Sequence, residues 1–130
     1  MFMEINHLSL LVNDEKEALK FYIGVLGFEI VVDKIESGKR VLIIAPKGQR
    51  KNGLILVKAD SEEKKALVGN QASSSAFFTL KTDNCLEEAR KLKAKGVDFT
   101  QEPVEKYGKI SAVFLDIYGN LVQMVEKIRP

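Results

Sequence analysis

Short stretches of the chain alternate between hydrophobic and polar residues, and two longer stretches between them carry hydrophobic residues at helical spacing. Alternation indicates a strand with one buried face, because successive side chains of a strand point to opposite sides. Spacing of three to four residues indicates an amphipathic helix. The pattern predicts helices over residues 15–25 and 85–95, and strands over residues 4–12, 28–35, 40–45, 54–58, 76–82, 97–103, 110–116 and 121–126.

The same order of elements occurs twice. Ile5–Asp14 leads into the first helix as Ser75–Asn84 leads into the second, and a glycine ends each helix before the next strand begins. Asn13 or Asp14 is expected to cap the first helix. Leu86, Ala89 and Leu92 are expected to face inward from the second.

This duplication predicts an α+β fold in which two βαβββ modules form a curved mixed sheet around a shared cleft. The modules span about residues 1–59 and 75–130 of a single domain, 1–130, and residues 60–74 are expected to be a linker with mobile parts. A tight turn over Asp116–Asn120 is expected to join the last two strands, with a glycine where the backbone needs positive φ.

The repeat also predicts which side chains occupy equivalent positions. Superposing the halves pairs His7 with Phe77 on the first strand of each module. The same superposition pairs Leu56 with Gln123 on the last strand. We expect these four residues to face the shared cleft.

Three segments resemble one known family: His7–Val12, Phe21–Phe28 with its Leu-Gly-Phe end, and Asp116–Gln123 with its Gly-Asn turn. The chain resembles the vicinal oxygen chelate superfamily, which includes glyoxalase I, extradiol dioxygenases and the fosfomycin and bleomycin resistance proteins. The resemblance covers nearly the whole chain and is specific for the fold, but only weakly specific for any reaction.

The resemblance implies that metal-dependent members bind one divalent ion at these four positions and use it to hold two adjacent substrate oxygens. This chain departs from that pattern, because Leu56 and Phe77 have no metal-binding atom and Gln123 replaces the usual glutamate. Catalytic zinc sites generally use three protein ligands, and His7 is the only histidine. We therefore predict no metal cofactor; any ion bound would use His7 and Gln123.

Each candidate residue has two open interpretations. His7 is either a general base or hydrogen-bond donor, since histidine ordinarily titrates near neutral pH, or a hydrogen-bonded strand residue. Gln123 either orients a ligand or is satisfied by His7 or the backbone. Phe77 either stacks on a flat ligand or fills the space that a metal would occupy. Tyr107 either overhangs the cleft or lies on the surface. Arg40 either offers a forked donor to an anion or is an exposed arginine at a strand end.

Composition limits the partners and the cellular compartment that we expect for the protein. A net charge of +2 is too small to suggest nucleic acid as a partner, and the basic segment Lys47–Lys51 is interpreted as a solvated loop. No apolar run approaches the roughly 18 residues that a membrane helix needs, and no signal peptide is expected. Cys85 is the only cysteine, so a reducing cytoplasm is expected. Cys85 begins a helix, but no histidine or acid accompanies it, so no nucleophilic role is predicted.

Three functions are weighed. The first is a metal-free small-molecule-binding protein of the bleomycin-resistance type, which sequesters a compound and is favoured by the apolar residues at ligand positions. The second is an enzyme, a glyoxalase-type lyase or isomerase or a dioxygenase, working through His7 and Gln123. The third is an interaction module whose cleft is filled by its own side chains. A homodimer is expected, as the resemblance implies.

Overall fold

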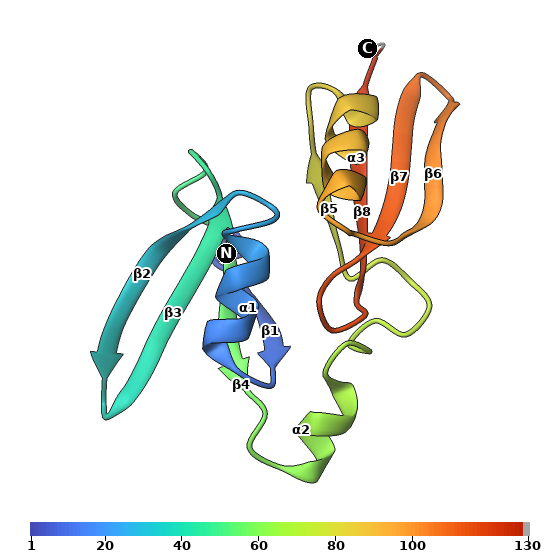
Figure 1. Ribbon diagram of the computed structural model, residues 1–130. Helices are drawn as coiled ribbons and strands as arrows, with labels where there is room; N and C mark the ends of the chain where they lie inside the picture. Colours follow the sequence, from blue (N-terminus) through green and yellow to red (C-terminus); the bar gives the residue numbers. More distant parts are fainter. Residues whose placement is uncertain (129–130) are drawn as a thin grey trace. The chain divides into compact units, whose positions relative to one another are not determined.

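The structure is a computed structural model that describes residues 1–128, and the chain divides into two compact units between Ala66 and Leu67. Each unit contains one four-stranded mixed sheet and the βαβββ order of elements, as Figure 1 shows. The predicted α+β class and the duplicated module are confirmed. The boundary between the units falls inside the predicted linker, at the end of the short helix α2 (Glu62–Leu67).

Unit 1 contains β1 (Leu8–Val12), α1 (Glu15–Tyr22), β2 (Phe28–Glu36), β3 (Lys39–Pro46) and β4 (Leu54–Lys58). The order in the sheet is β1-β4-β3-β2, with β1 and β4 parallel and the other neighbours antiparallel. Asp14 caps α1, because its side chain accepts the backbone N–H of Lys16. The hairpin between β2 and β3 turns through Ser37 and Gly38, both at positive φ.

One face of the unit 1 sheet forms its core. Alternate residues of the strands are buried on this face, and α1 contributes Ala18 and Tyr22, both with no exposed surface. The Tyr22 ring packs edge-on against Phe28 with centroids 5.4 Å apart. Full burial of one such large apolar side chain stabilises a fold by about 2 to 3 kcal/mol. The strand residues of this core are Leu10, Val12, Phe28, Leu42, Ile44, Leu54 and Leu56.

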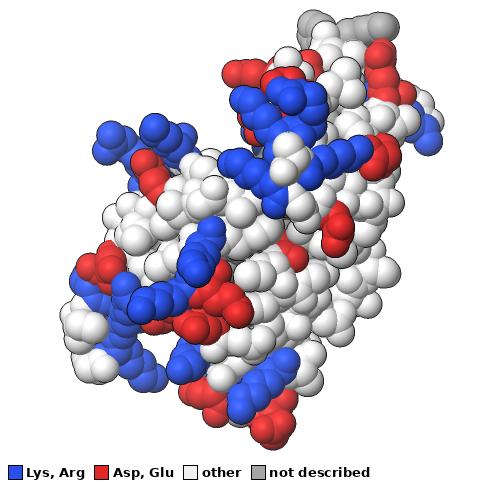
Figure 2. All heavy atoms as spheres, viewed as in Figure 1, with Lys and Arg blue, Asp and Glu red and all other residues white. Residues whose placement is uncertain are grey.

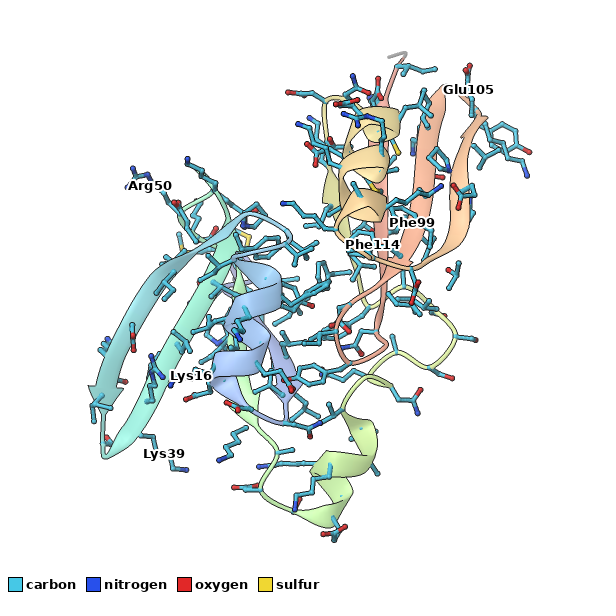
Figure 3. The ribbon with its side chains drawn as sticks, viewed as in Figure 1. Lys16, Lys39, Arg50, Phe99, Glu105 and Phe114 are labelled. Carbon is cyan, nitrogen blue, oxygen red and sulfur yellow. The ribbon has the colours of Figure 1, made fainter. Side chains whose placement is uncertain are left out.

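Unit 2 contains β5 (Phe78–Lys81), α3 (Cys85–Ala94), β6 (Phe99–Lys106), β7 (Lys109–Leu115) and β8 (Leu121–Lys127), in the sheet order β5-β8-β7-β6. Asn84 caps α3 by accepting the N–H of Glu87 at 3.1 Å. The rings of Phe99 and Phe114, labelled in Figure 3, lie 5.7 Å apart in the core. Ala112, Val122 and Met124 are buried on the same face as Phe114.

The prediction that Leu86 faces inward is wrong, because its side chain is 60% exposed. Cys85 is buried in its place, together with Ala89 and Leu92. Positions 85, 89 and 92 follow one another at spacings of four and three residues, so they form one stripe along the helix. The helix therefore turns its first residue inward and its second outward.

The segment predicted as a linker is bound to the turn between β7 and β8. The side-chain oxygen of Asn120 accepts the backbone N–H of Gln71 at 3.4 Å. Gly69, at a φ of 77°, lies so close to Tyr118 that a β-carbon there would meet the Tyr118 carbonyl oxygen at 1.8 Å. Gly69 and Gln71 therefore pack against the β7–β8 turn of their own unit, so this part of the predicted linker belongs to the folded structure of unit 2.

Candidate functional site

Each sheet has a second face, opposite its core, and the strand register aligns one row of side chains across it. We call these the unit 1 face and the unit 2 face. The two rows correspond because they occupy the same places in the two repeated sheets. The row on the unit 1 face is Val32, Ile43, Ile55 and Ser9, and the row on the unit 2 face is Gln101, Val113, Gln123 and Thr79.

This register corrects one predicted equivalence. Leu56 pairs with Leu10 and is 4% exposed, so it belongs to the core of unit 1. The residue that corresponds to Gln123 is Ile55, one position earlier. Because strand side chains alternate, a shift of one residue moves a side chain to the opposite face of the sheet. The chemistry is unchanged, since isoleucine, like leucine, has no metal-binding atom.

His7 lies immediately before β1 and two positions before Ser9, and its side chain is exposed. It lines a hollow of about 270 Å³ that is formed entirely by unit 1. Val31, Val32 and Ile43 are the apolar residues that line this hollow. The remaining lining residues come from the N-terminal segment and from the loop between β3 and β4: Glu4, Asn6, Arg50, Lys51 and Asn52.

Gln123 and Phe77 both belong to unit 2. The hydroxyl of Thr79 donates to Oε1 of Gln123 at 3.0 Å, so the partner of the glutamine is its neighbour across the β5–β8 pair. This hydrogen bond engages the side-chain oxygen of Gln123 and does not involve its amide nitrogen, which is a donor. The ring of Phe77 packs edge-on against Phe78 with centroids 5.7 Å apart, and Phe77 is half-buried.

Arg40 is held by carboxylates of its own unit. Its guanidinium donates to both carboxylate oxygens of Asp33, at 2.9 and 2.8 Å, and to Glu15 at 3.2 Å. This hydrogen-bonded pair lowers the pKa of Asp33 and raises that of Arg40. The guanidinium that the sequence suggested as a donor to an anionic ligand is therefore already bound to Asp33 and Glu15. Bidentate arginine–carboxylate pairs of this kind are stronger than neutral hydrogen bonds.

Tyr107 lies at the tip of the β6–β7 hairpin, at a φ of 53°, and its side chain is 90% exposed. The ammonium group of Lys106 lies 5.6 Å from its ring centroid. These observations favour the interpretation of Tyr107 as a surface residue of the turn.

Cys85 is buried, and burial together with the negative charge of Glu126 raises the pKa of its thiol. Glu126 also accepts the backbone N–H of Cys85 at 2.9 Å, which satisfies one free donor at the start of α3. A raised pKa disfavours the thiolate that a nucleophile needs. Glu126 corrects the expectation that no acid accompanies Cys85, but its negative charge raises the thiol pKa and so disfavours a nucleophile.

The donor set does not fit a catalytic metal. Of the four corresponding positions, only His7 and Gln123 carry a donor atom, and neither group brings a negative charge. Within residues 1–128, no three His, Cys, Asp or Glu side chains lie close enough together to hold an ion. We therefore assign no chemical step to a bound metal.

Arg50 and Ile55 are the positions that the sequence interpretation missed. The pattern of the basic segment Lys47–Lys51 indicates a solvated loop and carries no signal that Arg50 lines the same hollow as His7. Residues 54–57 are all apolar, so the pattern does not show which face of β4 is buried, and only the register of the structure identifies Ile55.

Comparison with known proteins identifies related sequences along almost the whole chain. The Glyoxalase/Bleomycin resistance protein/Dioxygenase superfamily profile matches residues 4–124. An uncharacterized protein of Shewanella frigidimarina is 35% identical over 129 residues, which are 97% of this chain and 95% of that protein.

Two solved structures are also similar. The crystal structure of UcmS2 has a TM-score of 0.82 at 28% identity and covers 96% of this chain and 98% of its own. The structure of TnmS3, an antibiotic binding protein from Streptomyces sp. CB03234, has a TM-score of 0.78 at 25% identity and covers 97% of both chains. Among the described residues, no helix is long and apolar enough to span a membrane.

Proposed function

This chain belongs to the Glyoxalase/Bleomycin resistance protein/Dioxygenase superfamily, and from that premise we propose that it binds a small molecule without a metal ion and sequesters it. The observation that carries the proposal is the hollow of unit 1, which is lined by the apolar Val32 and Ile43 and by polar groups of His7, Asn6 and Asn52. Apolar lining with a few polar groups is typical of ligand-binding sites.

The similarity to TnmS3 supports the same proposal, because that protein is described as an antibiotic binding protein. The proposal takes from this comparison only the class of function, which is the binding of an organic compound. It includes a homodimer, in line with the resemblance, and a location in the cytoplasm, in line with the single cysteine, Cys85.

A thermal-shift screen tests the proposal. Nickel or zinc added to the EDTA-treated protein is expected to change Tm by less than about 1 °C, because two neutral donors bind a divalent ion weakly. A binding compound at 100 times its Kd stabilises the folded protein by about 2.7 kcal/mol, which raises Tm by roughly 10 °C.

The controls for this screen are a known nickel-binding protein in the same buffer and each compound without protein. A rise of several degrees with a metal alone would favour the enzyme interpretation. A broad library of aromatic and natural-product-like compounds that yields no shift at all would reject small-molecule binding.

Replacing Phe77 by alanine is expected to lower the affinity for one aromatic compound by about three- to tenfold. This compound is the one that gives the largest shift of Tm in that screen. The physical reason is the loss of ring stacking, which is worth about 0.5 to 1.5 kcal/mol. Isothermal titration of both proteins measures the change. Phe2→Ala is the matched control, since Phe2 is fully exposed near the N-terminus. Equal affinities for the wild type and Phe77→Ala would remove Phe77 from the binding site.

A further inference from the structure

The hollow of unit 1 combines apolar and basic lining residues. Val31, Val32 and Ile43 are its apolar residues, and His7, Arg50 and Lys51 are the basic ones. Its volume of about 270 Å³ is slightly below the range of about 300 to 1,000 Å³ that is usual for small-molecule sites. A site of this size suits one or two fused rings with a short substituent.

The charges at the hollow do not cancel. Glu4 is the only acidic lining residue, and its carboxylate pairs with the ammonium of Lys51 at 3.5 Å. Arg50 takes part in no hydrogen bond or ion pair with another group in the described part of the chain. One guanidinium charge is therefore left at the hollow without a counterion among residues 1–128.

The loop that carries Arg50 is joined to the segment before β1. The side-chain amide of Asn52 donates to the carbonyl of Ile5, and the Glu4–Lys51 ion pair bridges the same two segments. Arg50 and Asn52 both adopt positive φ, at 65° and 58°. Figure 3 labels Arg50 on this loop, and Figure 2 shows Lys and Arg side chains gathered at the same end of unit 1. These contacts hold the loop in a position where Arg50 and His7 line the same hollow.

We propose that the hollow binds a small organic anion, with an apolar ring on Val32 and Ile43 and a carboxylate or phosphate group at Arg50. His7 supplies a second hydrogen-bond donor to the same anionic group. Arginine suits this role because its planar guanidinium binds two oxygens of one anionic group at once. The inference rests on the proposed function and narrows it to one class of ligand.

Three probes that share one ring system test the inference: 2-naphthoate, 2-naphthyl phosphate and 2-naphthalenemethanol. Their affinities are measured by isothermal titration at low salt, and amide shifts in NMR spectra locate the site. At least one anion is expected to bind about tenfold more tightly than the neutral alcohol, with shifts at Val32, Ile43 and Arg50. The two anions together distinguish a carboxylate ligand from a phosphate ligand.

Arg50→Gln is expected to lower the affinity for the more tightly bound anion about tenfold and to leave the affinity for the alcohol unchanged. Arg50→Lys keeps the charge and is expected to restore part of the loss. Lys47→Gln is the matched control, because it removes the same charge from the same loop at a position that does not line the hollow. Its affinities are expected to equal those of the wild type. Thermal denaturation of each variant confirms that it is folded.

Two results would overturn the inference and leave the proposed function standing: equal affinity for the alcohol and both anions, or unchanged anion affinity in Arg50→Gln. Failure of all three probes to saturate at millimolar concentration would also overturn it. The proposed function fails by a different result, which is a library screen without any ligand.

Discussion

Replacement of Asp116 by alanine is expected to lower the free energy of unfolding by about 3 kcal/mol. Asp116 is 5% exposed, and its Oδ1 accepts the backbone N–H groups of Tyr118 and Asn120 at 2.9 and 2.8 Å. Its Oδ2 accepts the side-chain amide of Asn120 at 3.0 Å. Alanine offers none of these acceptors, so buried donors lose their partners, and each such loss costs about 1 to 3 kcal/mol.

Urea denaturation followed by circular dichroism measures this loss. Asp98→Ala is the matched control, because Asp98 is exposed in the same unit and, among the described residues, only its backbone carbonyl accepts a hydrogen bond, from Leu115. The control is expected to change the free energy of unfolding by at most about 0.5 kcal/mol. A loss below about 1 kcal/mol in Asp116→Ala would show that the turn does not depend on this carboxylate.

Replacement of Gly69 by alanine is also expected to cost about 3 kcal/mol, for two separate reasons. A residue with a β-carbon pays about 1 to 2 kcal/mol for the left-handed conformation that Gly69 adopts at a φ of 77°. The new β-carbon would also lie 1.8 Å from the carbonyl oxygen of Tyr118, so the backbone must move. Overpacking of this kind typically costs a further 1 to 3 kcal/mol.

Gly48→Ala separates the two reasons. Gly48 has a φ of 89°, but a β-carbon there would meet no atom within 4 Å. Its replacement is therefore expected to cost only about 1 to 2 kcal/mol. The difference between the two variants measures the clash with Tyr118. Equal losses in the two urea titrations would mean that the segment after α2 does not pack against the β7–β8 turn.

These two predictions concern the same contact from opposite sides. Asp116 and Asn120 hold the turn in shape, and the turn receives Gly69 and the backbone N–H of Gln71. The connection between the two modules is therefore part of the folded structure of unit 2. Loosening this contact should affect stability before it affects the unit 1 hollow, because the two lie in different units.

The amino-acid sequence by itself determined the element order, the duplication and most element boundaries of this protein. Helix caps and tight turns depend on contacts within a few residues, so the local sequence encodes them. They include the caps Asp14 and Asn84, the hairpin turn at Ser37–Gly38 and the turn that ends at Asn120. The periods of the apolar residues act over one element and identify its buried face. The motifs within His7–Val12, Phe21–Phe28 and Asp116–Gln123, and not these periods, carried the resemblance that the family match confirmed.

The site depended on information that no local pattern contains. The first strand begins at Leu8 and not at residue 4, because its pairing with β4 begins at Leu8 and Leu54. The register of the same pair makes Ile55 the counterpart of Gln123 and places Leu56 in the core.

Only the tertiary structure decided which charges are available to a ligand. Arg40 meets Asp33 and Glu15 from other elements, whereas Arg50 lies beside His7 because its loop is joined to the N-terminal segment. In both cases the partners are separated along the chain, and the strand register and loop course that join them arise only when the sheet forms.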